Sequence, residues 1–287
     1  QRAFMNIADK WQDYTLIDSG DGEKLEKWGN VTVRRPDPEA IWAQSALPLW
    51  NQADYTYTRS VTGGGAWDKP ADFSWTVSYH DLKFKVGLMG FKHMGLFPEQ
   101  AYNWDYIMAK IKASNRTDIK VLNLFAYTGG ATIASSFAGA AEVVHVDASK
   151  GMISWANDNV KLNGLENHTI RFICDDCLKF VKREIKRGHH YDCIIMDPPS
   201  FGRGSSGEVW KFDHDIQNLI TECTQLLTPN PLFMLVNSYT TGISSQAVAN
   251  ILTTTLPQGQ VTCGELGLIA QSNQLVLPCG IYARWEK

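Results

Sequence analysis

The sequence predicts an α/β protein in which a small N-terminal β domain precedes a doubly wound sheet of seven strands, and three observations support this prediction. From about residue 118 onward, short apolar runs alternate with segments of helical periodicity, as expected for parallel strands joined by crossover helices. Glycines or acidic residues follow several of these runs, at the edge where such sheets bind ligands. Before residue 70, short β-prone runs instead flank Asp-Gly and Gly-Asn turn signals.

The N-terminal part is expected to begin with a β-meander over residues 14–35, because turn signals separate its β-prone runs. Prolines and the Gly63-Gly64-Gly65 run predict an irregular segment over 36–72, with a short helix near 38–45. Residues 73–79 and 82–86 alternate apolar and polar side chains around a polar pair, which predicts a hairpin. We therefore expect a β domain over residues 1–70 and a second domain over 71–287, in which 73–100 form the hairpin and a linker.

The core of the second domain is expected to occupy residues 118–287. Its predicted strands are residues 120–125, 142–147, 169–174, 191–196, 232–237, 263–269 and 279–285. Its predicted helices are residues 131–138, 150–163, 176–188, 213–227 and 244–256. The region contains no internal repeat, so the alternation of strands and helices indicates one doubly wound sheet.

Composition excludes several classes of protein. The 287 residues carry 27 Lys plus Arg against 30 Asp plus Glu, a formal charge of -3, which excludes a polybasic tail. No run approaches the roughly 20 apolar residues of a membrane span, and the first residues do not resemble a signal peptide. We expect a soluble, cytoplasmic protein with no membrane partner. Seven of the ten Trp residues precede residue 105, which predicts either an aromatic core in the N-terminal third or a surface that binds something flat.

Six cysteines are too few for a disulfide scaffold in a chain of this length. Cys174 and Cys177 have C-x-x-C spacing, but no second pair follows to complete a four-ligand zinc site. We therefore predict no metal, and interpret these two cysteines as small residues at a strand end.

Three predicted strands end in residues suited to binding a nucleoside. After 120–125, the turn 126–131 contains two glycines, which let the backbone enter a helix sharply and present N–H groups to a ligand; the alternative is a tight turn without a ligand. Asp147 ends the second strand, where doubly wound proteins bind ribose hydroxyls, unless it caps the next helix, a role that Ser149 could fill. Asp175 or Asp176 could accept a hydrogen bond from an adenine amino group.

The fourth strand ends in Asp197-Pro198-Pro199-Ser200-Phe201. Two prolines remove backbone donors and restrict φ, which directs the Asp197 carboxylate and the neighbouring carbonyls toward the ligand edge as acceptors. A simple end of a strand requires neither the second proline nor the acid, so this motif predicts a functional site.

Together these motifs resemble class I S-adenosylmethionine-dependent methyltransferases, which have a Rossmann-like fold. The resemblance rests on Asn123-x-Phe125-x-Tyr127-Thr128-Gly129-Gly130, Asp147-Ala148-Ser149-Lys150, Trp155-Ala156-x-x-Asn159-x-x-x-Asn163-Gly164, Asp176-Cys177-Leu178 and Asp197-Pro198-Pro199-Ser200-Phe201. Within that class the chain is most similar to bacterial large-subunit ribosomal RNA methyltransferases that act on cytosine C5 or guanine N7. Phe91 to Gln100 is similar to that family's K-T-G-x-x-x-D-Q segment, so the resemblance covers about residues 73–287.

The resemblance implies S-adenosylmethionine as cofactor and assigns roles by position. The motif around Asn123, Phe125 and the Tyr127-Thr128-Gly129 turn would bind the methionine part, Asp147 the ribose, and Asp176 with Cys177 the adenine. Lys92 and Gln100 would close the pocket from the linker side. Asp197, Pro198 and Phe201 would face the methyl acceptor, with Asp197 also next to the cofactor.

The acceptor chemistry follows from what the motifs contain. Cytosine C5 needs a thiolate nucleophile, which the C5 enzymes of this family carry after the fifth strand, but residues 235–240 contain no Cys. Cys193 is expected to face a core and Cys177 the adenine, so neither replaces it. An exocyclic amine needs acceptors, which Asp197 and the Pro198 carbonyl could supply, yet Ser200 rather than an aromatic residue follows the prolines. Guanine N7 needs positioning alone and is slightly favoured.

Phe201 and Tyr239 are candidates to stack on the base, although Phe201 could equally be a hydrophobic plug on the sheet edge. Residues 202–211 are predicted to be either a lid that orders over substrate or a solvated loop. The basic residues of 182–187 are interpreted as the solvated face of a helix.

The sequence thus predicts a methyltransferase acting on a base nitrogen of ribosomal RNA, in which the N-terminal β domain helps to dock the substrate. The alternatives are a protein or small-molecule acceptor, or a cofactor-binding module without turnover. A homodimer is compatible with the sequence, which leaves the oligomeric state open.

Overall fold

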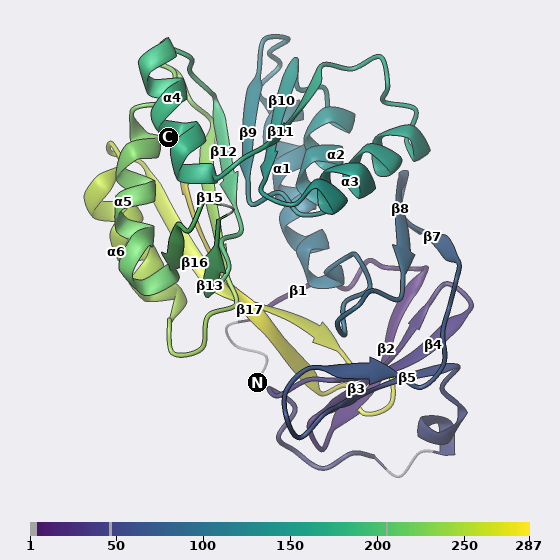
Figure 1. Ribbon diagram of the computed structural model, residues 1–287. Helices are drawn as coiled ribbons and strands as arrows, with labels where there is room; N and C mark the ends of the chain where they lie inside the picture. Colours follow the sequence, from purple (N-terminus) through teal and green to yellow (C-terminus); the bar gives the residue numbers. More distant parts are fainter. Residues whose placement is uncertain (1–4, 46–47, 205) are drawn as a thin grey trace. The chain divides into compact units, whose positions relative to one another are not determined.

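The computed structural model describes residues 5–45, 48–204 and 206–287 (Figure 1). The described chain divides into two compact units. Unit 1 comprises Asn103–Glu265 and Gly280–Lys287, and unit 2 comprises Met5–Tyr102 and Leu266–Cys279. The boundary predicted near residue 70 lies inside unit 2, because the hairpin that follows it bonds to the first strands: Trp75 Nε1 donates to the Trp28 carbonyl at 2.9 Å.

The main sheet has the order β1-β16-β17-β15-β12-β9-β10-β11. Its strands are β1 (Met5–Ile7), β9 (Lys120–Leu124), β10 (Glu142–Asp147), β11 (Ile170–Cys174), β12 (Cys193–Met196), β15 (Phe233–Ser238), β16 (Gln260–Ile269) and β17 (Val276–Glu286). The strands β11, β10, β9, β12 and β15 run parallel, and β17 pairs antiparallel with β15. The predicted doubly wound sheet is therefore confirmed, with the short strand β1 as an addition.

Six helices flank the sheet of unit 1. They are α1 (Ala101–Ala113), α2 (Gly130–Phe137), α3 (Lys150–Leu162), α4 (Cys177–Arg187), α5 (Phe212–Thr224) and α6 (Ser245–Thr255). Figure 1 shows α1, α2 and α3 on one face of the sheet and α4, α5 and α6 on the other. Five of the six were predicted within three residues at each end, whereas α1 was not predicted. Its buried residues Trp104, Ile107 and Ile111 have helical spacing, which was the available signal.

Successive side chains along a strand point to opposite faces of the sheet, so they pack against different layers of helices. Leu122, Val144 and Met196 belong to a buried cluster with residues of α4, α5 and α6. The intervening side chains face the other layer: the Phe233 ring lies 5.3 Å from that of Tyr106 in α1. Because apolar residues occupy both faces, the central strands read as nearly continuous apolar runs.

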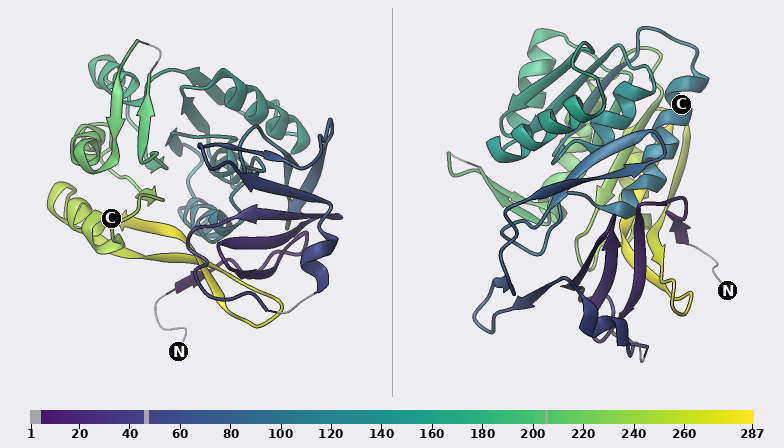
Figure 2. Two further views of the ribbon diagram at one scale, coloured as in Figure 1. Left: turned by 60° about the horizontal axis from the view of Figure 1, so that its bottom comes forward. Right: turned by 90° about the vertical axis from the view of Figure 1, so that its right-hand side faces the viewer.

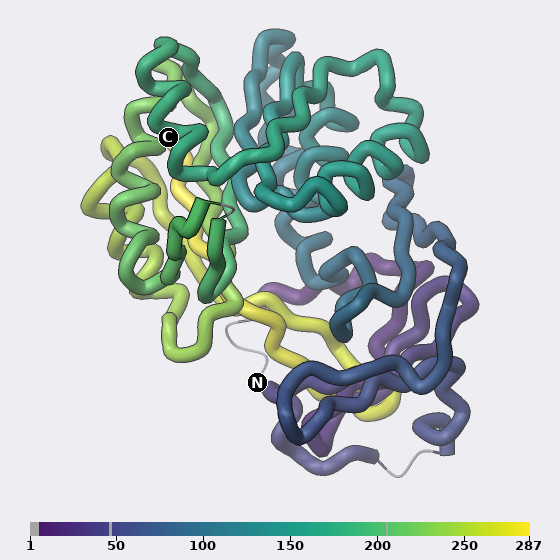
Figure 3. Tube along the Cα trace, viewed as in Figure 1, coloured from purple at the N-terminus to yellow at the C-terminus, as the bar shows by residue number. Residues whose placement is uncertain are grey.

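The chain changes direction within the sheet between β9 and β12. As the trace in Figure 3 shows, it passes from β9 to β10 and β11, and then returns to the other side of β9 as β12. In a doubly wound sheet, ligands bind outside the carboxyl ends of the strands at this reversal. Residues 125–130 and 197–201 follow the two strands that flank it.

Unit 2 contains a five-stranded sheet and a separate hairpin. The sheet has the order β2-β3-β4-β5-β6, and the hairpin pairs β7 with β8. The strands are β2 (Tyr14–Gly20), β3 (Glu23–Trp28), β4 (Val31–Pro36), β5 (Tyr55–Arg59), β6 (Gly65–Trp67), β7 (Ser74–Tyr79) and β8 (Leu82–Gly87). The predicted meander and hairpin are confirmed.

The segment over 36–72 is more regular than predicted. It contains the strands β5 and β6, and residues 38–45 form no helix; the 3-10 turn η1 (Pro48–Gln52) follows instead. The prolines and glycines of this segment predicted irregular structure. Pairing with β4, seen at Val33↔Tyr55, nevertheless produces the strand β5.

Aromatic side chains form much of the interior of unit 2, which confirms the predicted aromatic core. The Tyr14 and Trp28 rings lie 4.7 Å apart, and both are buried. Beside them Arg35 donates to the buried Glu26 carboxylate at 2.6 Å, and Tyr14 Oη donates to the same carboxylate at 2.6 Å. Both partners of this buried ion pair are thereby hydrogen-bonded, as burial requires.

Among the described residues, no helix is long and apolar enough to cross a membrane. Within the same residues, no group of three or more His, Cys, Asp or Glu side chains is arranged to hold a metal ion.

Candidate active site

The turn after β9 has an unusual backbone. Phe125 and Tyr127 both have φ of 53°, and Gly129 has φ of 87°. Positive φ is costly for bulky residues and persists where the surroundings impose it, which occurs most often at functional sites. Gly129 is the residue before α2, and a Cβ there would lie 3.2 Å from that of Ala156 and 3.3 Å from the His145 ring. Glycine is therefore required at this position for both conformation and space.

Hydrogen bonds from three neighbouring elements hold this turn. Asp147 Oδ2, at the end of β10, accepts from the Tyr127 backbone N–H at 2.9 Å. Asn159, buried in α3, donates from Nδ2 to the Thr128 carbonyl at 2.8 Å. Cys177 Sγ, at the start of α4, lies 3.3 Å from the Phe125 backbone nitrogen. The turn is thus preorganised by residues distant in the sequence.

The Asp147 carboxylate is suited to binding a diol. Each of its oxygens accepts one backbone N–H at 2.9 Å, Oδ2 from Tyr127 and Oδ1 from Ser149. A carboxylate has about four acceptor positions, so two remain for hydroxyl groups. Burial raises the pKa of Asp147 above its ordinary value, while the two N–H groups oppose that shift. Asp147 is not the cap of α3, because Ser149 Oγ accepts from the Met152 backbone N–H and caps that helix.

Asn123 lies behind the turn. It is buried in β9, and its Nδ2 donates to Thr132 Oγ1 of α2 at 3.0 Å. Thr132 Oγ1 lies in turn 2.9 Å from His145 Nδ1 of β10. Strand register places Asn123 and His145 opposite each other, so both face α2. Sequence reasoning missed Thr132 and His145; the signal available was a histidine in the middle of an apolar strand.

The residues predicted to bind adenine form different contacts within the protein. Asp176 Oδ1 accepts from the Lys179 backbone N–H at 2.9 Å and caps α4, whereas Asp175 forms an ion pair with Arg183. Cys177 is only 3% exposed, and burial raises the pKa of its thiol well above the ordinary value. Its sulfur bonds to the backbone of Phe125, as described above, so whether it touches adenine stays a prediction.

The acceptor motif follows β12. The Asp197 backbone N–H bonds to the Leu124 carbonyl at 3.3 Å, which joins this motif to the end of β9. Pro198 is buried, whereas Phe201 is 52% exposed. Ser200 Oγ lies 3.0 Å from Thr240 Oγ1 in the segment after β15. The motif therefore presents an acid and an exposed ring beside the turn that carries Phe125.

Residues 201–203 and 209–211 pair as a hairpin, where the sequence predicted a lid or a solvated loop, and the role of a lid stays a prediction. Strand β13 (Phe201–Arg203) pairs antiparallel with β14 (Val209–Lys211), and the hairpin projects from the main sheet (Figure 2). Trp210 Nε1 donates to the Pro199 carbonyl at 2.7 Å, and its ring lies 5.3 Å from that of Phe125. The indole thus fastens the hairpin to the acceptor motif.

Tyr239, the second predicted stacking residue, follows β15 and is 38% exposed. Its ring lies against β17, where a Cβ at Gly280 would be 2.7 Å from Tyr239 Cδ1. Among the described cysteines, Cys193 and Cys223 are buried, and burial raises the pKa of both thiols. Cys193 faces the core as predicted, and neither thiol is suited to nucleophilic attack.

Lys92 and Gln100 lie in unit 2. Lys92 Nζ donates to the Pro36 carbonyl at 3.2 Å, and burial next to Lys24 and Arg59 lowers the pKa of its ammonium to about 8. The Gln100 backbone N–H bonds to the Phe97 carbonyl at 3.0 Å at the end of a short 3-10 turn. Their predicted role in closing the cofactor pocket stays a prediction.

The sheet order, with an antiparallel β17 and an acid at the end of β10, defines the class I methyltransferase fold. A model of the S-adenosylmethionine-dependent methyltransferase family matches residues 58–248, and the chain belongs to that family. This confirms the predicted class of enzyme and its cofactor at the level of the family.

Two relatives support the assignment. "Ribosomal RNA large subunit methyltransferase K/L" of Shewanella baltica (strain OS155 / ATCC BAA-1091) is 33% identical over 238 residues, covering 81% of this chain and 32% of that protein. The chain thus spans about a third of the length of the curated relatives it matches. The crystal structure of the S-adenosylmethionine-dependent methyltransferase from Agrobacterium tumefaciens has a TM-score of 0.93 and 36% identity, covering 100% and 94% of the two chains.

SMU.776, a protein assigned as a methyltransferase and complexed with S-adenosylhomocysteine, shares the fold. It has a TM-score of 0.73 and 16% identity, covering 96% of this chain and 76% of that one.

The residues present fit the cofactor. The Asp147 oxygens retain acceptor capacity for two ribose hydroxyls, and the Tyr127 to Gly129 turn is held rigidly beside them. These are the donor and acceptor types that a nucleoside with an amino-acid side chain requires.

Proposed function

We propose that this chain transfers a methyl group from S-adenosylmethionine to a base nitrogen of ribosomal RNA. The observation that carries the proposal is the acceptor motif: Asp197 and the half-exposed Phe201 follow β12, next to the rigid turn after β9. An acid and a carbonyl can accept hydrogen bonds from a base, and an exposed ring can stack on it, so the motif could position a base nitrogen. The name of the Shewanella baltica relative supports RNA as the acceptor. In bacteria this function would locate the protein in the cytoplasm.

The residues of the chain act by binding and alignment. Bound S-adenosylmethionine would supply an electrophilic methyl group on a sulfonium. Asp147 would hold the ribose and the Tyr127 to Gly129 backbone the methionine part, which directs the methyl group toward Asp197. Phe201 would stack on the base. Alignment of this kind can lower a barrier by roughly 7–11 kcal/mol.

The choice of atom follows from the groups at the acceptor motif. Carbon 5 of cytosine would need a thiolate, but residues 235–240 contain no Cys, and Cys177 and Cys193 are buried thiols with raised pKa values. Guanine N7 carries an in-plane lone pair and needs only to be positioned. Asp197 and the Pro198 carbonyl could then accept hydrogen bonds from other edges of the base, so we favour N7 over an exocyclic amine.

The test combines cofactor binding with methyl transfer. Isothermal titration with S-adenosylhomocysteine should show binding, and tritiated methyl groups should be transferred to ribosomal RNA from cells that lack the protein. Asp197→Ala should abolish most transfer while retaining most of the affinity for S-adenosylhomocysteine. Asp147→Asn should weaken that affinity by about 10- to 100-fold, because its amide N–H₂ would face a backbone N–H. Glu142→Gln, at the opposite end of β10, is the matched control and should change neither property.

Absence of S-adenosylhomocysteine binding would contradict the whole proposal. Binding without transfer to RNA would leave a protein or small-molecule acceptor, or a module without turnover.

A further inference from the structure

Helix α4 carries five cationic side chains on one face: Lys179, Lys182, Arg183, Lys186 and Arg187. Their spacing of i, i+3, i+4, i+7 and i+8 places them in one stripe along the helix, and all five are exposed. The opposite face, with Phe180 and Val181, is buried against the sheet. At 1.5 Å per residue the stripe is about 12 Å long. We refer to these five residues as the cationic face.

This face is unfavourable for the helix by itself. It brings like charges together at i,i+4 three times, and each such pair destabilises a helix slightly. The acid within α4 is Glu184, which is buried and accepts from Tyr191 Oη at 2.6 Å. Ordinary solvated helices mix both signs of charge. In a chain with a formal charge of -3, this local concentration indicates that the face binds an anion.

The ion pairs of the cationic face leave capacity for such a partner. Lys179 pairs with Glu208, Arg183 with Asp175, and Arg187 with Glu184 at 3.4 Å. The three cationic side chains are about half-exposed. The acids that pair with Lys179 and Arg183 are also partly exposed, and such pairs contribute roughly 0–1 kcal/mol, so a polyanion can replace these two acids. Among the described residues, Lys182 and Lys186 form no ion pair.

The cationic face is linked to the acceptor motif through the hairpin over Phe201–Arg203 and Val209–Lys211. Glu208, the partner of Lys179, belongs to the hairpin that begins at Phe201, directly after Asp197-Pro198-Pro199-Ser200. Arg203 and Lys211, also on that hairpin, are exposed cations. Exposed cations therefore lie both on the hairpin that follows the acceptor motif and on α4, within unit 1.

We propose that the cationic face of α4 binds the phosphate backbone of the RNA substrate and holds it while the target base is at the acceptor motif. This inference rests on the proposed function, since it names the surface that recognises the RNA. Phosphate contacts position a nucleic acid without reading its sequence, so this face would supply affinity and leave the choice of base to the acceptor motif.

The experiment compares two double variants of the full chain. Lys182→Gln/Lys186→Gln removes the two cations without an ion pair, so the fold should be retained. Lys112→Gln/Lys161→Gln removes two exposed cations from α1 and α3 and is the matched control. The probe is an in vitro transcript of large-subunit ribosomal RNA, and its dissociation constant is measured between 50 and 200 mM KCl, roughly the range in which such salt effects are large.

If the cationic face binds phosphate, the plot of log affinity against log salt should become shallower by about 1.4–1.8 for the α4 variant, or about 0.7–0.9 per phosphate contact. Its KM for RNA should rise, while kcat at saturating RNA and the affinity for S-adenosylhomocysteine stay unchanged. The control variant should retain the wild-type slope.

A wild-type slope for the α4 variant, with intact methylation of RNA by the wild type, would overturn this inference alone. Failure of the wild type to methylate RNA would instead overturn the proposed function, and the inference with it.

Discussion

At the scale of the residue, His145 determines how the turn after β9 is supported. Its Nδ1 lies 2.9 Å from Thr132 Oγ1, which already accepts from Asn123 Nδ2. The single hydrogen of the Thr132 hydroxyl is free to point toward Nδ1, so a neutral imidazole can accept it there. Burial lowers the pKa of His145 to about 3, against a small opposing effect of the Tyr127 backbone. His145 is thus a neutral ring packed against Gly129, which the sequence does not reveal.

This neutral histidine predicts a pH dependence of stability. Between about pH 6.5 and pH 3 the unfolded chain binds a proton at this position and the folded chain does not, so the free energy of unfolding falls as pH falls. The contribution is about 1.4 kcal/mol per pH unit. Urea unfolding at pH 7, 6 and 5 should give a steeper loss for the wild type than for His145→Gln.

The same residue can be observed directly. In the folded protein, the His145 ring resonances should not titrate above about pH 5, because its pKa is depressed to about 3. Titration of these resonances near pH 6.5, or equal slopes for the two proteins, would contradict the assignment.

At the scale of the element, the helix caps show which of the acids after the strands has a structural role. Ser149 caps α3 and Asp176 caps α4, which leaves Asp147 to support the turn. An acid that caps a helix can also accept a bond from a ligand, since each carboxylate oxygen has two lone pairs. The two roles of Asp176 can therefore be tested separately.

Asp176→Ser retains a capping side chain and removes the carboxylate charge, whereas Asp176→Ala removes both. Asp176→Ala should lower the free energy of unfolding by about 1 kcal/mol, and Asp176→Ser should change it much less, because serine is a comparable cap. If the carboxylate binds adenine, both variants should weaken S-adenosylhomocysteine binding by a similar factor in isothermal titration. Wild-type affinity for Asp176→Ser would assign Asp176 to the helix alone.

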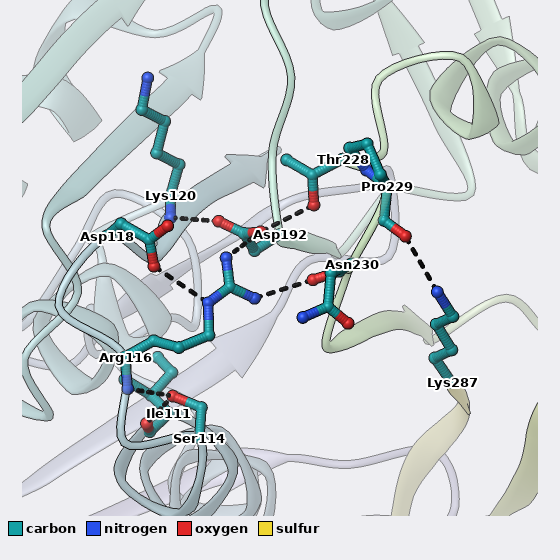
Figure 4. A network of polar contacts seen from close by, with 10 residues as sticks. All are labelled: Ile111, Ser114, Arg116, Asp118, Lys120, Asp192, Thr228, Pro229, Asn230 and Lys287. Atoms are coloured by element: carbon teal, nitrogen blue, oxygen red, sulfur yellow. Dashed lines mark hydrogen bonds and ion pairs between the residues drawn. The ribbon is translucent and has the colours of Figure 1, made fainter.

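At the scale of the molecule, a polar network joins segments distant in sequence at the amino ends of β9 and β12 (Figure 4). Asp192 is 2% exposed and accepts from Arg116 at 2.9 Å, from Thr228 Oγ1 at 2.7 Å and from the Lys120 backbone N–H at 2.9 Å. Arg116 also donates to the Asn230 carbonyl at 2.8 Å. The network connects the start of β9, the start of β12 and the segment before β15.

Asp192→Ala should destabilise the protein by about 1–3 kcal/mol, because it leaves the Thr228 hydroxyl and the Lys120 backbone N–H without their buried acceptor. Asp118→Ala is the matched control, since Asp118 also pairs with Arg116 at 2.9 Å but its side chain is 73% exposed. Its cost should be much smaller, because ion pairs of exposed side chains contribute little to stability. Urea unfolding of both variants would measure the difference, and equal costs would show that burial of Asp192 is not the cause.

The sequence by itself determined seven strands of the main sheet, most helices and the acids that follow the strands. Apolar runs of strand length and helical periods are local patterns, and parallel strands place Asp147 and Asp197 at one edge whatever the details of packing. That is why the fold class and the motifs of the site could be predicted.

Only the tertiary structure decided what each side chain contacts. Pairing with β4 makes β5 a strand, strand register aims Asn123 at Thr132, and packing buries Cys177. The segment after Phe201 pairs as a hairpin, and Trp210 bonds it to Pro199. These outcomes depend on contacts between residues that are separate in the sequence, and patterns read along the chain do not contain such contacts.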